Sequence, residues 1–209
     1  MRYLITQSLL SAWNYVHTCY PGCEEDAMAS FLSTLRKEPE DLTEDQIQYM
    51  QNGIAFESAV YAKALGKENN ANPKWQSGIE AVAAFVTGAQ FQVKLKRELQ
   101  IGDITFLVYG VLDALKAGII SDIKFKNKSF GSLDLPGEYF DSPQHPIYFY
   151  LAPEAHEFQY LVSDGVDLYI ERYTPEETVS AESIIAEFVE FLKASDLMGE
   201  YQKYWQALS

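Results

Sequence analysis

The sequence predicts a mixed α/β (α+β) fold, because its hydrophobic pattern changes twice along the 209 residues. Residues 1–90 carry apolar side chains at the three-to-four spacing of helices. Residues 91–173 alternate apolar and polar side chains between turn signals, which predicts strands. Residues 174–209 return to helical spacing. The length suits one well-buried core, so we expect a single domain over 1–209.

The helical region contains three segments with apolar periodicity, at 28–38, 45–68 and 74–90. Thr43 precedes the second segment as an N-cap, and Pro73 follows that segment as a helix breaker. We therefore expect helices over these three ranges and irregular chain between them.

The strand region opens with three segments, at 91–101, 104–115 and 119–125. Short turns containing Gly102 and Gly118 separate them, which predicts an antiparallel meander. The middle segment is apolar on both faces, as expected for a central strand.

A Gly- and Pro-containing loop is expected next, followed by a short helix within 143–155 that Pro146 delays or bends. Segments 157–164 and 166–173 then predict a second hairpin. Amphipathic spacing from Pro175 onward predicts two final helices, and that proline with its following glutamates suits a helix N-terminus.

The charge of the chain is strongly negative but unevenly spread. Sixteen Lys and Arg against 30 Asp and Glu give a net charge of −14, which taken alone argues against a nucleic-acid partner. Residues 94–128 contain seven basic against four acidic residues, so this segment is +3 and the remainder is −17. A locally basic surface on an acidic body is compatible with a phosphate-bearing substrate held at one place.

The chain contains no apolar run near the ~20 residues that span a bilayer, so we expect no membrane segment. The opening residues 1–13 lack the pattern of a signal peptide, so we expect a cytoplasmic domain. Cys19 and Cys23 are too few for a disulfide framework or an all-cysteine metal site. Two reduced thiols are expected, with a half-site completed by other residues as the alternative.

Two carboxylates and a lysine lie near one hairpin. Asp113 ends the most apolar strand, where a lone buried carboxylate is unfavourable unless it is paired or bound to a metal. Asp122 lies across the hairpin, and Lys124 lies on the same strand face as Asp122 because side chains alternate. This set predicts a hard cation, Mg²⁺ or Mn²⁺, with an activated water. The alternative is an ordinary ion pair at a sheet edge.

Four short motifs follow one another on a helix, two strands and a helix. They are G-x-x-x-E with Gly53 and Glu57, G-x-x-D with Gly110 and Asp113, D-x-K with Asp122 and Lys124, and Q-x-x-x-Y with Gln144 and Tyr148. Their order resembles the PD-(D/E)XK nuclease superfamily, and most closely its RecB-type exonuclease branch. Residues 5–22 also resemble the N-terminal segment of that branch, although "CYPG" matches it only approximately. The iron–sulfur cluster of some members needs four cysteines and is not expected here.

The resemblance implies a restriction-endonuclease-like core, a central mixed sheet flanked by helices, with Glu57 supplied by the N-terminal helical region. It implies that Glu57, Asp113, Asp122 and the carbonyl of Ile123 hold the cation. Lys124 would orient the attacking water and offset charge in the transition state.

The resemblance gives Gln144 and Tyr148 supporting roles, in which they would brace the site or contact the substrate strand. Lys126 and Lys128 continue the face of Lys124, so we expect them to contact phosphates, with ordinary solvated lysines as the alternative.

The function implied is that of a metal-dependent DNA nuclease, an exonuclease that hydrolyses phosphodiester bonds in recombination, repair or phage replication. DNA is the expected partner, and a protein partner or a homo-oligomer stays open. The alternative is a catalytically silent subunit or adaptor with the nuclease fold, which the competent residue types at all four motifs argue against. An acidic DNA mimic is a third reading, which the +3 segment opposes.

Overall fold

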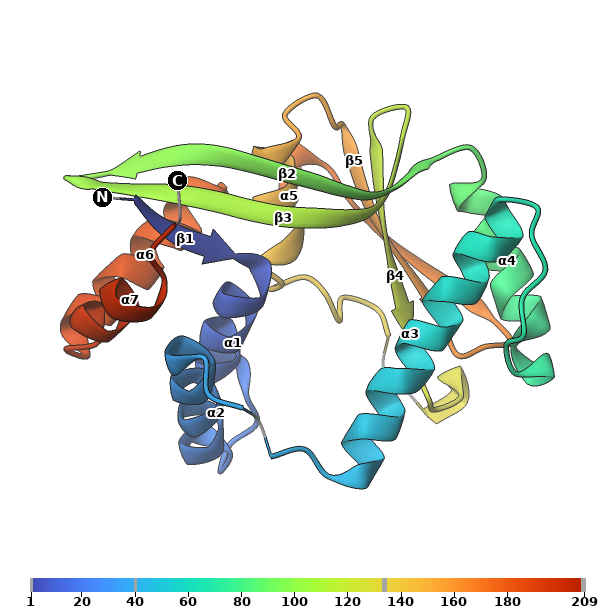
Figure 1. Cartoon of the computed structure of the whole chain (residues 1–209), viewed down its shortest axis with the longest axis horizontal. Coiled ribbons are helices and arrows are strands. Elements are labelled where there is room, and N and C mark those ends of the chain that lie inside the picture. Colours follow the sequence, from blue (N-terminus) through green and yellow to red (C-terminus); the bar gives the residue numbers. More distant parts are fainter. Residues whose placement is uncertain (1, 40, 133–134, 208–209) are drawn as a thin grey trace.

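The computed structural model describes residues 2–39, 41–132 and 135–207. It confirms the predicted α+β class, with a central mixed sheet flanked by helices (Figure 1). The strands of this sheet are β1 (Arg2–Thr6), β2 (Gln90–Ile101), β3 (Ile104–Lys116), β4 (Ile119–Phe125), β5 (Glu157–Ser163) and β6 (Leu168–Tyr173).

The helices lie at both ends of the sheet, with α3 and α4 at one end and α1, α2, α6 and α7 at the other (Figure 1). Their bounds are α1 (Gln7–Thr18), α2 (Glu24–Arg36), α3 (Glu44–Ala64), α4 (Gln76–Val86), α5 (Gln144–Leu151), α6 (Ala181–Ala194) and α7 (Met198–Tyr204). Short 3-10 turns at Pro73–Trp75, Phe130–Ser132 and Pro175–Glu177 complete the secondary structure of the described chain.

The long strand β3 organises the sheet. β2 pairs with it in antiparallel orientation from Ile104 to Leu115, which confirms the predicted hairpin. The opposite edge of β3 is shared, because β1 pairs in parallel with Thr105–Tyr109 and β4 pairs antiparallel with Ala114–Lys116. Within the described chain, no strand pairs with that edge between these two segments. β5 continues parallel to β4, and β6 pairs antiparallel with β5.

One expectation about a helix boundary is confirmed by local capping. Thr43 caps α3, and its capping box with Gln46 is complete. Pro146, by contrast, does not delay its helix: α5 begins at Gln144, and Pro146 lies in the first turn, where a missing N–H is tolerated.

Two expectations about the chain ends are wrong. Arg2–Thr6 forms strand β1 rather than helix, because it completes the shared edge of β3. The sixth helix begins at Ala181 with Ser180 as its N-cap, and Pro175 opens a separate 3-10 turn. The two final helices are confirmed as α6 and α7, and after Tyr204 the chain runs beside β1.

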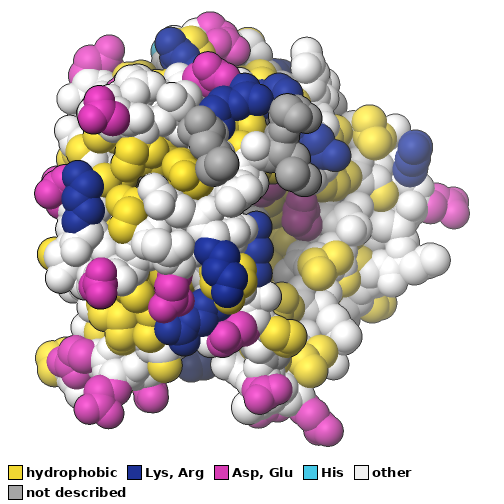
Figure 2. Space-filling model, turned by 60° about the vertical axis from the view of Figure 1, so that its left-hand side comes forward, with side chains coloured by type: hydrophobic (Ala, Val, Ile, Leu, Met, Phe, Trp, Pro, Cys, Tyr) yellow, Lys and Arg dark blue, Asp and Glu magenta, His cyan; other side chains and the backbone are white. Residues whose placement is uncertain are grey.

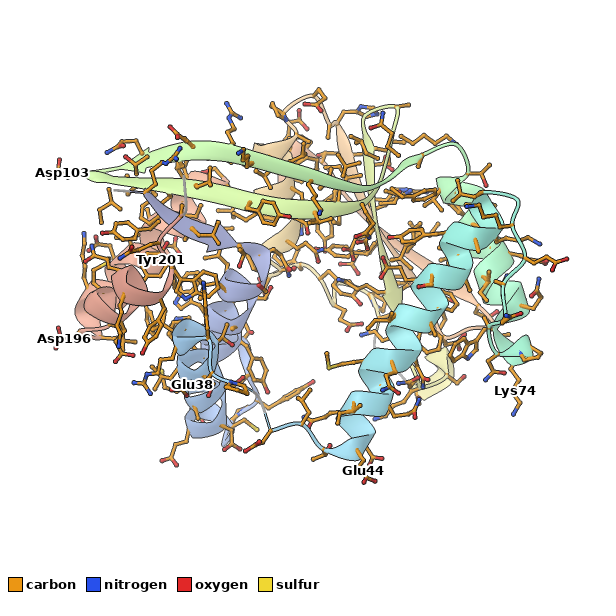
Figure 3. All side chains as sticks on the ribbon, viewed as in Figure 1. Glu38, Glu44, Lys74, Asp103, Asp196 and Tyr201 are labelled. Carbon is orange, nitrogen blue, oxygen red and sulfur yellow. The ribbon has the colours of Figure 1, made fainter. Side chains whose placement is uncertain are left out.

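The segment after α7 is hydrogen-bonded to β1, which brings the two described ends of the chain together. The Leu4 N–H donates to the Trp205 carbonyl at 2.6 Å, and the Ala207 N–H donates to the Arg2 carbonyl at 2.9 Å. Tyr201, labelled in Figure 3, donates its hydroxyl to the Leu4 carbonyl at 2.9 Å. These bonds fix α7 against β1.

The buried side chains form two hydrophobic clusters. The larger packs α1, α2, α5, α6 and α7 against β1, β3 and β5. The smaller lies between α3, α4 and the strands β3, β4 and β5, where Phe56 stacks on Phe125 with ring centroids 4.8 Å apart. β3 contributes to both, with Leu112 in the larger cluster and Ala114 in the smaller.

Within the described residues, no helix is long and apolar enough to cross a membrane.

Candidate active site

The candidate site lies where β3 and β4 diverge. Their ladder ends at the pair Ala114 and Ser121, so the next opposed residues would be Asp113 and Asp122. The Asp113 carboxylate instead accepts a hydrogen bond from the Ile123 N–H at 3.0 Å. A side chain thus replaces the strand partner, and two carboxylates from neighbouring strands lie at this opening.

Asp122 is almost fully buried, with 3% of its surface exposed. Its Oδ1 accepts a hydrogen bond from the Gln144 amide, and the Gln144 Oε1 accepts one from Lys124 Nζ at 3.2 Å. Asp122 Oδ2 lies 2.8 Å from Lys124 Nζ as an ion pair but accepts no well-aligned hydrogen bond. The predicted same-face contact of Asp122 and Lys124 is confirmed, and Gln144 bridges the two.

The carboxylates influence one another electrostatically. Burial, followed by the negative charges of Asp122 and Glu57, raises the pKa of Asp113 to about 8. Burial alone would lower the pKa of Lys124, but the carboxylates of Asp122, Asp113 and Glu57 outweigh it and raise that pKa. The lysine is therefore held as a cation beside carboxylates that repel each other.

Glu57 reaches the site from α3. Its Oε1 accepts hydrogen bonds from the Tyr61 hydroxyl and from Gln92 Nε2, the latter at 3.0 Å. The amide of Gln92 also donates to the Tyr61 hydroxyl at 2.8 Å. No described residue donates to Glu57 Oε2. One oxygen of this carboxylate is thus fixed and the other is left available.

Tyr148 covers the part of β3 that has no strand partner on its shared edge. Its hydroxyl donates to the Val111 carbonyl at 3.0 Å. A Cβ on Gly110 would lie 2.7 Å from Tyr148 Cε1 and 2.8 Å from Leu151 Cδ1. The glycine of G-x-x-D is therefore required for α5 to pack on β3.

The glycine of G-x-x-x-E has no such role. A Cβ on Gly53 would meet nothing within 4 Å, so no close backbone approach depends on this glycine. Glu57 is held by its own neighbours, Tyr61 and Gln92.

The remaining predicted residues lie around the same strand. The Ile123 side chain is buried in the smaller cluster. Lys126 forms an ion pair with Glu138, so its ammonium is already engaged. Lys128 is exposed. Cys19 and Cys23 are half-buried free thiols. Cys19 begins the loop between α1 and α2, and Cys23 ends it.

Sequence reasoning missed Tyr61 and Gln92. Tyr61 follows Glu57 by four residues on one helix, a spacing that brings side chains together and could have identified it. Gln92 carries no comparable signal, because its contact depends on the packing of β2 against α3.

The acidic residues of the site have the chemistry of a divalent-cation site but are not gathered as one. Among the described residues, no three Asp, Glu, His or Cys side chains stand close enough together to hold one. The donor set is nevertheless of the right kind, since carboxylate oxygens suit Mg²⁺ and Mn²⁺. Asp122 Oδ2 is a buried oxygen without a hydrogen bond, and Glu57 Oε2 is likewise unbonded. The donor chemistry and the two unbonded oxygens therefore fit such a cation, although the described acidic side chains are not gathered around one point.

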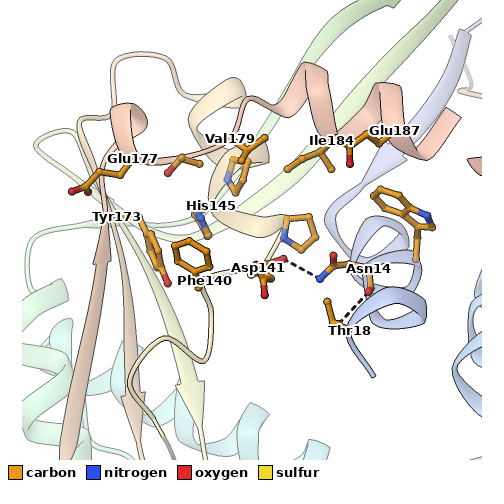
Figure 4. A pocket seen from close by; sticks show the side chains of 15 residues that line it. Asn14, Thr18, Phe140, Asp141, His145, Tyr173, Glu177, Val179, Ile184 and Glu187 are labelled. Carbon is orange, nitrogen blue, oxygen red and sulfur yellow. Dashed lines mark hydrogen bonds between the residues drawn. The ribbon is translucent and has the colours of Figure 1, made fainter. Parts of the chain in front are cut away.

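A separate cavity of about 420 Å³ lies beside α5 (Figure 4). The acidic residues Asp141, Glu177 and Glu187 line it, and its described lining contains no Lys or Arg. Burial lowers the pKa of His145 in its wall to about 4, so this imidazole is neutral at pH 7. The cavity contains none of the predicted site residues and is poorly suited to phosphate.

On the face shown in Figure 2, acidic side chains are scattered, and Lys and Arg lie in a few small groups.

Searches against protein-family models and against curated proteins find no match. Among solved structures, the chain in "Crystal structure of SSO0001" is 16% identical to this chain, with a TM-score of 0.45. The match covers 93% of this chain and 78% of that one. The crystal structure of Scheffersomyces stipitis Rai1 is 14% identical with a TM-score of 0.40, covering 92% of this chain. This chain spans 61% of that Rai1 chain. Similarity at this level assigns no function.

Proposed function

We propose that the protein is a divalent-metal-dependent DNA nuclease, acting as an exonuclease on phosphodiester bonds. The observation that carries the proposal is the group at the β3–β4 opening. There the charges of Asp122 and Glu57 both act on Asp113, and Lys124 is paired with the buried Asp122. The resemblance of the four motifs points to the same chemistry.

In this proposal Glu57, Asp113 and Asp122 hold Mg²⁺ or Mn²⁺, and the Ile123 carbonyl adds a ligand. The cation supplies Lewis acidity and positive charge at the scissile phosphate. Lys124 orients the attacking water and stabilises the negative charge that develops on the phosphate oxygens.

Two residues of α5 support these groups. Gln144 holds Asp122 and Lys124 in register through its amide. Tyr148 anchors α5 to β3 through the Val111 carbonyl, which keeps Gln144 in place.

The test measures cleavage of end-labelled linear DNA with Mg²⁺ or Mn²⁺, with circular DNA and EDTA as comparisons. We expect Asp113→Asn and Lys124→Gln to lower the rate at least ~100-fold, because the first removes a ligand of the cation and the second removes positive charge at the reacting phosphate. Asp103→Asn is the matched control, since Asp103 lies at the far tip of the β2–β3 hairpin (Figure 3). Unchanged cleavage in the two site variants would refute the assigned roles, and equal cleavage of circular DNA would refute the exonuclease assignment.

A catalytically silent nuclease-fold subunit or adaptor is the second candidate. One observation favours it: no three acidic side chains of the described chain are already gathered for a metal. Calorimetric titration with Mn²⁺ separates the candidates, because a silent adaptor should show no binding that depends on Asp113 and Asp122.

A further inference from the structure

Gln92 has an unusual backbone conformation for a residue inside a strand. Its φ is +52°, in the left-handed region that residues other than glycine rarely adopt. Its neighbours pair regularly with β3, Phe91 with Ala114 and Val93 with Leu112. The irregularity is therefore confined to one residue, which lies opposite Asp113 in the register of the hairpin.

This conformation changes where the side chains point. In a regular strand, Phe91 and Gln92 would lie on opposite faces. Here both contact Tyr61: the Phe91 ring centroid lies 4.7 Å from that of Tyr61, and Gln92 Nε2 donates to its hydroxyl at 2.8 Å. The left-handed residue thus brings the amide to the α3 side of β2, where it also reaches Glu57.

The hydrogen bonds among Gln92, Tyr61 and Glu57 all run toward the Glu57 carboxylate. Gln92 donates to both Tyr61 and Glu57, and Tyr61 donates to the same Glu57 oxygen, Oε1. Glu57 Oε2 receives no donor from the described residues.

We infer that Tyr61 and Gln92 are positioning residues, which fix Oε1 of Glu57 so that Oε2 is presented to the divalent cation. The inference rests on the proposed function, since it concerns the same carboxylate. It assigns a role to the strained conformation of Gln92: local strain persists in proteins where the surrounding structure and function require it.

The test is calorimetric titration of the whole protein with Mn²⁺ in the absence of DNA, together with thermal denaturation. Gln92→Gly removes the amide and relieves the left-handed conformation. Tyr61→Phe removes only the hydroxyl and keeps the ring on Phe91. We expect each variant to weaken Mn²⁺ binding by about 10-fold, the usual effect of losing a residue that orients a metal ligand. The double variant should lose less than the product of the two, because both act through one oxygen.

Ala117→Gly is the matched control for strain. Ala117 also has a left-handed φ, +50°, but it lies in the β3–β4 turn. Glycine there should raise the melting temperature without changing Mn²⁺ affinity. Gln92→Gly should not lower the melting temperature, so weaker binding could not be attributed to unfolding.

Glu57→Ala separates the inference from the proposed function. If Glu57→Ala weakens Mn²⁺ binding while Gln92→Gly and Tyr61→Phe bind as the parent does, the positioning role is wrong and the proposed site stands. If Glu57→Ala also binds as the parent does, or if the parent binds no Mn²⁺, the ligand set fails and the inference fails with it.

Discussion

At the scale of single residues, Asp113 is a group of the site whose charged form is disfavoured. Its carboxylate is half-buried and lies near two other carboxylates, so ionisation is unfavourable and the pKa rises to about 8. The unfolded chain would ionise near the ordinary value of 3.8. Between these values the native state holds a proton that the unfolded state releases, so this group makes stability fall as pH rises.

Asp113→Asn should therefore become more stable relative to the parent as pH rises from 5 to 9. Asparagine keeps an oxygen for the Ile123 N–H and carries no charge. The gain at pH 9 should be on the order of a few kcal/mol. Urea denaturation of both proteins in EDTA at several pH values measures it, and Asp103→Asn should show no such trend. A difference that stays constant with pH would contradict the raised pKa of Asp113.

The sequence predicted Asp113, Asp122 and Lys124 as neighbours because a tight hairpin fixes register and strand side chains alternate. The contact of Gln92 with the site was not predicted, because it needs a left-handed residue inside an otherwise alternating strand. Nothing in "FQVKL" signals that conformation, since glutamine has no preference for it.

At the scale of elements, packing decides what periodicity leaves open. The pattern of α3 predicted a helix correctly, yet its first two turns, residues 44–51, are exposed on all sides. Ile47 and Met50 are 42% and 53% exposed, whereas Phe56 is fully buried in the smaller cluster. Spacing establishes that a helix forms, but only the position of neighbouring elements determines which turns are covered.

The docking of α5 on β3 gives an element-scale prediction. Gly110→Ala should destabilise the protein by about 1–3 kcal/mol, because the new methyl group overlaps Tyr148 and Leu151. Gly53→Ala, in the middle of α3 and facing open space, should instead stabilise it by about 0.5–1 kcal/mol. Chemical denaturation measures both changes. Equal effects of the two substitutions would show that the close packing at Gly110 is wrong.

At the scale of the whole molecule, β3 joins the two hydrophobic clusters, and the paired chain ends belong to the larger one. The class of fold followed from the sequence, because three regions of distinct periodicity allow few other arrangements. The parallel placement of β1 on β3 did not, since it depends on contacts about 100 residues apart in the chain, such as Arg2 with Thr105.

Trp205 gives the corresponding prediction. Its indole donates to the Leu35 carbonyl at 2.7 Å, its own carbonyl accepts from Leu4, and only 6% of its surface is exposed. Trp205→Ala should lower the free energy of unfolding by about 3–5 kcal/mol, in one cooperative transition. Phe140→Ala, with a ring 68% exposed, is the control and should change it by less than ~0.5 kcal/mol. Two separate transitions in the thermal denaturation of Trp205→Ala would show that the clusters unfold independently.

The left-handed conformation of Gln92 has a consequence for solubility as well. In the described sheet, β2 has β3 as its one partner, so its outer edge could pair with a strand of another molecule and begin aggregation. Lys94, Lys96 and Arg97 place like charges along that edge, and the Tyr150 hydroxyl occupies the Glu98 carbonyl at 2.6 Å. The left-handed residue interrupts the regular extended backbone that an intermolecular ladder needs, so a fully extended β2 would make this acidic protein more prone to form fibrils.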